Sequence, residues 1–187
     1  MEALVVSILV VAIGEIGDKT QLLALMLAAR FRRPAPIVLG ILVATSANHT
    51  VAGLVGQWVR HVIPAEYLRW LLAGSFFAVA LWALKPDAVK EEERTPTNRF
   101  GVFAITLIAF FLAEIGDKTQ IATVVLAAQF GNLLAVVAGT TIGMLVADVP
   151  VVYLGHAASA KIPFSAVRYV AAGMFAALGV GALFLSG

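Results

Sequence analysis

The sequence predicts an all-α polytopic membrane protein with six transmembrane helices, arranged as two inverted three-helix repeats. Of its 187 residues, 61% are apolar and only 13% are charged, whereas about 25% of the residues in soluble domains are charged. The apolar residues also form long blocks, at 3–14, 100–113 and 169–187, and a transmembrane helix needs about 20 mostly apolar residues. Composition and block length therefore predict membrane spans and not a soluble domain.

Six apolar segments of spanning length follow one another along the chain, at residues 4–29, 35–59, 66–84, 101–128, 132–156 and 166–186. One clearly polar segment, 85–99, contains two prolines and eight charged residues. It predicts a first three-helix repeat at 1–84, a charged linker at 85–99 and a second three-helix repeat at 100–187. The first apolar block follows no basic segment and runs into Glu15, so we expect a retained helix and not a cleaved signal peptide.

The two predicted repeats share a motif-rich stretch. EIGDKTQLLALMLAARF (15–31) recurs as EIGDKTQIATVVLAAQF (114–130), with 11 of 17 positions identical at an offset of 99 residues. Each copy contains three spans, and an odd number makes the second copy enter the membrane from the opposite side. This inverted arrangement is common in transporters.

The basic residues of the predicted loops indicate the orientation, because cytoplasmic loops are enriched in lysine and arginine. One side has only Arg60 and Arg69. The other side has nine: Arg30, Arg32, Arg33, Lys85, Lys90, Arg94, Arg99, Lys161 and Arg168. We therefore expect a multi-pass protein of the cell (inner) membrane, with a cytoplasmic linker and both termini outside.

Six charged residues fall inside predicted spans, at a cost of about 2.5–3.5 kcal/mol each on insertion scales. They are Glu15, Asp18, Lys19, Glu114, Asp117 and Lys118. On a continuous helix the three charges of each copy would share one face. One interpretation is that Lys19 and Lys118 only neutralise the glutamates four residues before them. However, four acids and two bases leave a net charge of −2, which one divalent cation or two protons would balance.

The side chains around these charges offer oxygen ligands. Carboxylates of Glu15, Asp18, Glu114 and Asp117, with the amides of Gln21 and Gln120, suit hard cations such as calcium, magnesium or manganese. Copper and zinc are disfavoured because the chain has no cysteine and its three histidines do not cluster. We expect the transported cation to be the only metal, with no bound cofactor, and no nucleic-acid partner because no basic patch is present.

Other polar residues of the spans have auxiliary roles in this interpretation. Lys19, Lys118, Thr20 and Thr119 belong to the motifs, and the repeat register aligns His49 with Asp148. His49 is expected either to line a proton path or to form an interhelical hydrogen bond. For Asp148, a carboxylate in an apolar span, we expect a functional role. Thr45 is expected to be a packing residue. The glycines at 14, 17 and 116 indicate either a helix break or close helix packing, and the sequence leaves both open.

At EIGDKT, present at 15–20 and 114–119, the sequence resembles the GDT family of membrane cation/proton antiporters, marked by E-x-G-D-(K/R)-(T/S) in two inverted halves. The resemblance implies a transporter and not an enzyme. It implies export of manganese or calcium from the cytosol in exchange for protons, with Glu15, Asp18, Glu114 and Asp117 forming the cation site.

The sequence leaves three other functions to be considered. A passive divalent-cation channel would use the same acidic site. An intramembrane hydrolase would be expected to carry a motif such as H-E-x-x-H, which the chain lacks. A purely structural protein gives no reason to bury the same charges twice. Six short spans could form either a complete transporter or half of a homo-oligomer.

Overall fold

The computed structural model describes residues 1–84, 99–154 and 164–185, and these residues are helical apart from short connections. In chain order the helices are α1 (Glu2–Glu15), α2 (Lys19–Phe31), α3 (Pro34–Val62), α4 (Ala65–Ala83), α5 (Arg99–Glu114), α6 (Lys118–Phe130), α7 (Leu133–Leu154) and α9 (Phe164–Leu185). No strand occurs in the described ranges, which confirms the all-α prediction. The predicted linker at 85–99 lies outside the described residues, except for Arg99, where α5 begins.

Two helices, α3 and α7, are individually long and apolar enough to cross a membrane. A third candidate span is broken, because α5 and α6 meet at an angle of 69° across a short gap. The equivalent segment in the first half is also divided, into α1 and α2. The structure therefore favours breaks in both motif segments over continuous helices, while the total of six spans remains a prediction.

Each break contains a glycine in the left-handed region of backbone space. Gly17 has φ of 82° and Gly116 has φ of 72°, values that residues with a Cβ atom rarely adopt. Asp18 and Asp117 follow in extended conformations and are the N-cap residues of α2 and α6. The prediction that each motif's three charges share one face of a continuous helix is therefore wrong, because the helix ends and restarts between them.

Equivalent residues of the two halves, 99 positions apart, make equivalent contacts with the opposite half. Gly40 of α3 lies so close to α5 that a Cβ atom there would be 2.7 Å from Thr106 Cβ. At the equivalent place Gly139 of α7 meets α1, and a Cβ atom there would be 2.7 Å from Ser7 Cβ. Small residues permit such close backbone approach. Paired contacts of this kind are expected of two halves related by an approximate two-fold axis, and insertion of the second half from the opposite side remains a prediction.

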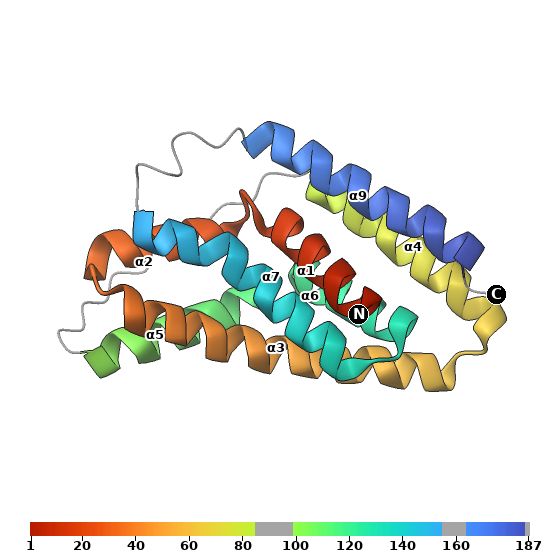
Figure 1. The fold of residues 1–187 in the computed structure, drawn as a ribbon, viewed down its shortest axis with the longest axis horizontal. Helices are drawn as coiled ribbons and strands as arrows, with labels where there is room; N and C mark the ends of the chain where they lie inside the picture. The colour runs from red at the N-terminus through yellow and green to blue at the C-terminus, as the bar shows by residue number, and fades with distance from the viewer. Residues whose placement is uncertain (85–98, 155–163, 186–187) are drawn as a thin grey trace.

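The last helices of the two halves, α4 and α9, lie side by side (Figure 1). This pair packs against α1 and α6, and it buries Phe76 and Phe175, which occupy equivalent positions in the repeats. Among the described helices, no comparable packing joins α9 to α2 or α4 to α5. The α4–α9 pair therefore covers the bundle unequally and leaves the end formed by α2 and α5 without it.

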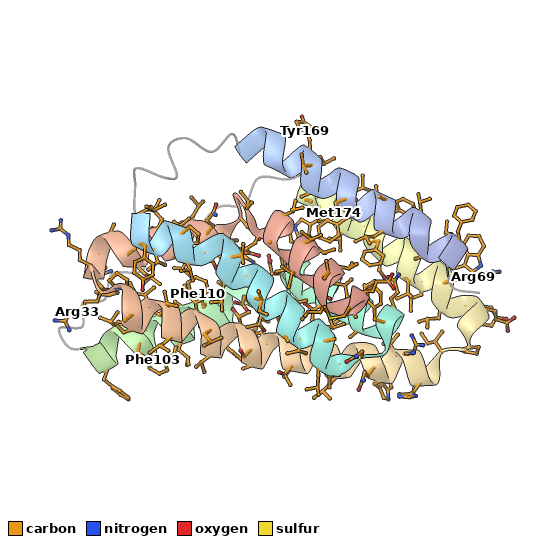
Figure 2. The ribbon with its side chains drawn as sticks, viewed as in Figure 1. Arg33, Arg69, Phe103, Phe110, Tyr169 and Met174 are labelled. Carbon is orange, nitrogen blue, oxygen red and sulfur yellow. The ribbon has the colours of Figure 1, made fainter. Side chains whose placement is uncertain are left out.

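Two of the basic residues used to predict the orientation lie far apart in the structure. Figure 2 shows Arg33, between α2 and α3, and Arg69, on α4, at opposite ends. This separation agrees with their assignment to loops on different sides. Which end faces the cytoplasm remains a prediction.

Candidate metal centre

Four helix ends carry the motif acids. Glu15 and Glu114 are the last residues of α1 and α5, and Asp18 and Asp117 precede the first residues of α2 and α6. All four side chains are buried, with exposed fractions of at most 1%. The C-terminal end of a helix carries partial negative charge and favours cations, while the N-terminal end favours carboxylates. Broken helices thus supply both polarities inside the buried part of the bundle.

The lysines of the two motifs form ion pairs across the halves. Lys19 Nζ lies 3.0 Å from Asp117 Oδ1, and Lys118 Nζ lies 2.8 Å from Asp18 Oδ1. The two ion pairs are equivalent in the repeat, because each residue of one pair is 99 positions from its counterpart in the other pair. The helix contacts described above show the same relation. They are unequally buried, because the Lys19 side chain is 25% exposed and the Lys118 side chain 5%. The interpretation in which each lysine neutralises its own glutamate is not the arrangement found.

Three of the four motif acids come together closely. One carboxylate oxygen from each of three buried residues, Glu15, Asp18 and Asp117, lies within 4.8 Å of the other two. Carboxylate oxygens are the ligands that calcium, magnesium and manganese prefer. The residues present therefore fit a hard divalent cation.

Glu114 has different surroundings from its counterpart Glu15. Thr45 Oγ1 donates to Glu114 Oε1 at 2.5 Å, and Asn48 Nδ2 donates to Glu114 Oε2 at 3.1 Å. In contrast, both carboxylate oxygens of Glu15 are buried without a hydrogen-bond partner in the described part of the chain. The residues of the second half that align with Thr45 and Asn48 are Met144 and Ala147, whose side chains offer no donor. The sequence itself therefore makes the two halves of the site unequal.

The motif glutamines stabilise the helix breaks. Gln21 Oε1 accepts from Gly17 N at 2.8 Å, and Gln120 Oε1 accepts from Gly116 N at 2.7 Å. Gln21 Nε2 also donates to the carbonyl oxygen of Ala147 on α7, at 3.1 Å. An amide oxygen has a second lone pair, so this bond leaves each glutamine one further acceptor position. Their predicted role as cation ligands remains a prediction.

The motif threonines differ in the same way as the glutamates. Thr119 donates through its backbone N and its Oγ1 to Asp117 Oδ2, at 3.4 and 3.1 Å, and so caps α6. Thr20 is buried, and its hydroxyl has no hydrogen-bond partner in the described ranges. The second motif is thus more fully hydrogen-bonded than the first.

His49 of α3 and Asp148 of α7 are fully buried. Neither ring nitrogen of His49 and neither carboxylate oxygen of Asp148 has a hydrogen-bond partner in the segments that the structure describes. Asp148 is near enough to Glu15 for the two carboxylates to repel each other, and His49 interacts electrostatically with Asp117. The interhelical hydrogen bond considered for His49 is not found, and its auxiliary role remains a prediction.

The chain also matches a known protein family. The profile described as "Divalent cation/proton antiporter GDT1" matches residues 3–91 and 102–186, which include both motifs. The chain belongs to the GDT1 family.

Curated relatives support this membership along most of the chain. A Vibrio cholerae protein named "Putative manganese exporter" is 47% identical over 185 residues, covering 98% of this chain and 92% of its own length. A GDT1-like protein of Synechocystis is 27% identical, covering 94% and 93% respectively. GDT1-like protein 3 of Oryza sativa is 26% identical and is covered over 74% of its length. No solved structure matches the chain.

The GDT1 motif does not reveal every residue at the centre. Thr45, expected to be a packing residue, donates to Glu114, and Asn48 donates to the same carboxylate. Both precede His49 on α3, and positions 45, 48 and 49 share one helix face. Three polar side chains on one face of an apolar helix were the available signal, but their partner could not be read from the motif spacing.

Proposed function

We propose that this GDT1-family chain exports divalent cations from the cytosol across the cell membrane in exchange for protons. The observation that carries the proposal is the buried group of Glu15, Asp18 and Asp117, whose oxygens lie within 4.8 Å of one another. We propose that three further residues help to bind the cation: Glu114, Gln21 and Gln120. Manganese is the first candidate, because the name of the Vibrio cholerae relative specifies it, and calcium is the second because it uses the same oxygen ligands.

The charges around the site suggest how a cation and protons replace each other. Asp18 and Asp117 each have a lysine partner, and Glu114 has two hydrogen-bond donors. In the described residues, neither Glu15 nor Asp148 has a lysine at ion-pair distance or a hydrogen-bond donor. One divalent cation or two protons would neutralise the charges of these two carboxylates. We therefore propose an electroneutral exchange in which cation and protons compete for the same buried charge, with His49 beside the proton path.

The unequal packing of the bundle suggests a route of access. The α4–α9 pair covers α1 and α6 but not α2 and α5, and Lys19, at the start of α2, is the more exposed of the two lysines. We propose that the site opens toward the α2–α5 end here, and that the pair moves onto α2 and α5 in the alternate state. We propose that this open end faces the cytoplasm, as the excess of basic residues in its loops favours.

Transport can be tested in proteoliposomes that enclose a pH-sensitive dye. A manganese or calcium gradient should drive proton movement in the opposite direction, and Asp18→Asn or Asp117→Asn should abolish both fluxes. Glu66→Gln, an exposed acid in the first turn of α4, is the control and should keep them. Undiminished flux in the aspartate variants would refute the carboxylate site. Cation flux without opposing proton movement would instead indicate a passive channel.

The access route can be tested separately, because the chain has no cysteine of its own. Gly14 faces Phe175 of α9, and a Cβ atom at Gly14 would lie 3.3 Å from that ring. Gly14→Cys with Phe175→Cys should therefore be joined by a short bifunctional thiol reagent, and this link should block transport. The equivalent pair, Ala113→Cys with Phe76→Cys, should be joined only while the protein is transporting. Equal linkage of both pairs without substrate would contradict the proposed movement.

A further inference from the structure

We propose that the two motif copies have different tasks: Glu15 is the glutamate that rearranges to bind the transported cation, and Thr45 and Asn48 hold Glu114 as a positioned, fixed charge. The inference rests on the proposed transport function and divides its site. The repeated EIGDKT motif gives no reason for such a division, because the two copies are identical. The difference comes from α3 and α7, which carry non-equivalent residues beside the two glutamates.

The hydrogen bonds show what holds Glu114. Each of its oxygens accepts from a different side chain of α3, at 2.5 Å from Thr45 Oγ1 and 3.1 Å from Asn48 Nδ2. Asn48 Nδ2 also donates to the carbonyl oxygen of Phe111, at 3.1 Å, which ties it to α5 itself. A carboxylate held by two donors must lose or rearrange these bonds before it can turn to a new ligand. Hydrogen bonds to charged groups are the stronger kind.

The contrast with Glu15 is complete at the equivalent place. Its oxygens have no hydrogen-bond donor in the described part of the chain, although the residue is fully buried. Burial of an ionised carboxylate without such compensation is costly. One of its oxygens clusters with an oxygen of Asp18 and one of Asp117, and Glu114 is not part of this cluster. A bound cation would supply the compensation that Glu15 lacks, so Glu15 is the glutamate whose contacts change when the cation binds.

The repeat supplies the experiment, because the donors of one half can be moved to the other. Met144 and Ala147 are buried on α7, which packs on α1 as α3 packs on α5. The double variant Met144→Thr with Ala147→Asn therefore offers Glu15 the two donors that Glu114 has. We expect the KM for manganese to rise by about tenfold or more, since the cation must now displace hydrogen bonds to a charged group, while the maximum rate falls much less.

The matched variant removes the donors from the other half. Thr45→Met with Asn48→Ala should lower the unfolding temperature measured without metal, because Glu114 is then buried without partners. Its KM for manganese should change less than that of the α7 variant. Restoring Asn48 alone should recover part of the lost stability. A KM effect in the α3 variant as large as that in the α7 variant would overturn the division of tasks.

A binding measurement decides the same question if either double variant fails to fold. Manganese should raise the unfolding temperature of the wild-type protein, because a ligand that binds only the folded state stabilises it. Glu15→Gln should abolish this shift, and Glu114→Gln should reduce it by a smaller amount. Equal loss in both variants would overturn the inference. A wild-type protein with no metal-driven proton movement would instead refute the transport function, so the two failures are distinguishable.

Discussion

Removal of the Lys118 charge tests the crossed ion pairs most directly. In the Lys118→Met variant the Asp18 carboxylate loses a partner at 2.8 Å while it remains fully buried. Loss of one partner of a buried ion pair costs about 3–5 kcal/mol. At about 2–4 °C per kcal/mol for a chain of this size, the unfolding temperature should fall by roughly 6–20 °C. Lys19→Met should cost less, because Lys19 is 25% exposed and Asp117 keeps its bonds to Thr119.

Thermal unfolding in detergent, with and without manganese, measures both effects. Lys118→Arg keeps the positive charge and is the control, so it should remain close to the wild type. Because Lys118→Met leaves the centre more negative, manganese should raise its unfolding temperature more than that of the wild-type protein. The reasoning fails if Lys19→Met is as destabilising as Lys118→Met, or if the Lys118 variant unfolds within about 2 °C of the wild type.

Two further predictions concern the backbone at and beyond the site. Gly116→Ala should lower stability by about 1–2 kcal/mol, because φ there is 72° although nothing lies within 4 Å of an added Cβ. Gly74→Ala, in α4 with equally open space, should instead be neutral or stabilising by up to about 1 kcal/mol, and a fall at both positions would contradict the role of φ. Arg60 donates to the carbonyl oxygens of Ala128 and Gln129 at 2.8 and 2.6 Å, so Arg60→Met should speed hydrogen exchange in the last turn of α6, and unchanged exchange would show that the cap is dispensable.

Much of the fold was predictable from composition and repetition. Long apolar blocks predicted an all-helical protein, and the offset of 99 residues predicted two equivalent sets of elements. The pairing of charges was not predictable, because Glu15 and Lys19 have the spacing of an ion pair only on a continuous helix. That helix ends at Glu15 and the chain turns at Gly17, so Lys19 reaches Asp117 in the other half. The sequence did not show whether the motif helix is broken, and this break determines which charged residues form ion pairs.

The difference between the surroundings of the two motif glutamates also could not be predicted from the motif. Two identical hexapeptides predict two identical half-sites, and the difference arises from residues outside the motifs, such as Thr45, which is 69 positions from Glu114. Their partners depend on how α3 packs against α5, which is a property of the folded bundle. The same holds for the α4–α9 pair, whose members are distant in sequence and belong to different halves.

The crossed ion pairs have a consequence for the origin of this architecture. Lys19 pairs with an aspartate of the second half, and Lys118 pairs with an aspartate of the first. A lone half would lack the ion-pair partners that the two halves supply to each other. An ancestor consisting of one half would therefore have needed a second copy of itself, inserted in the opposite direction, to complete each pair. Fusion of two such copies would have made this mutual dependence a property of one chain.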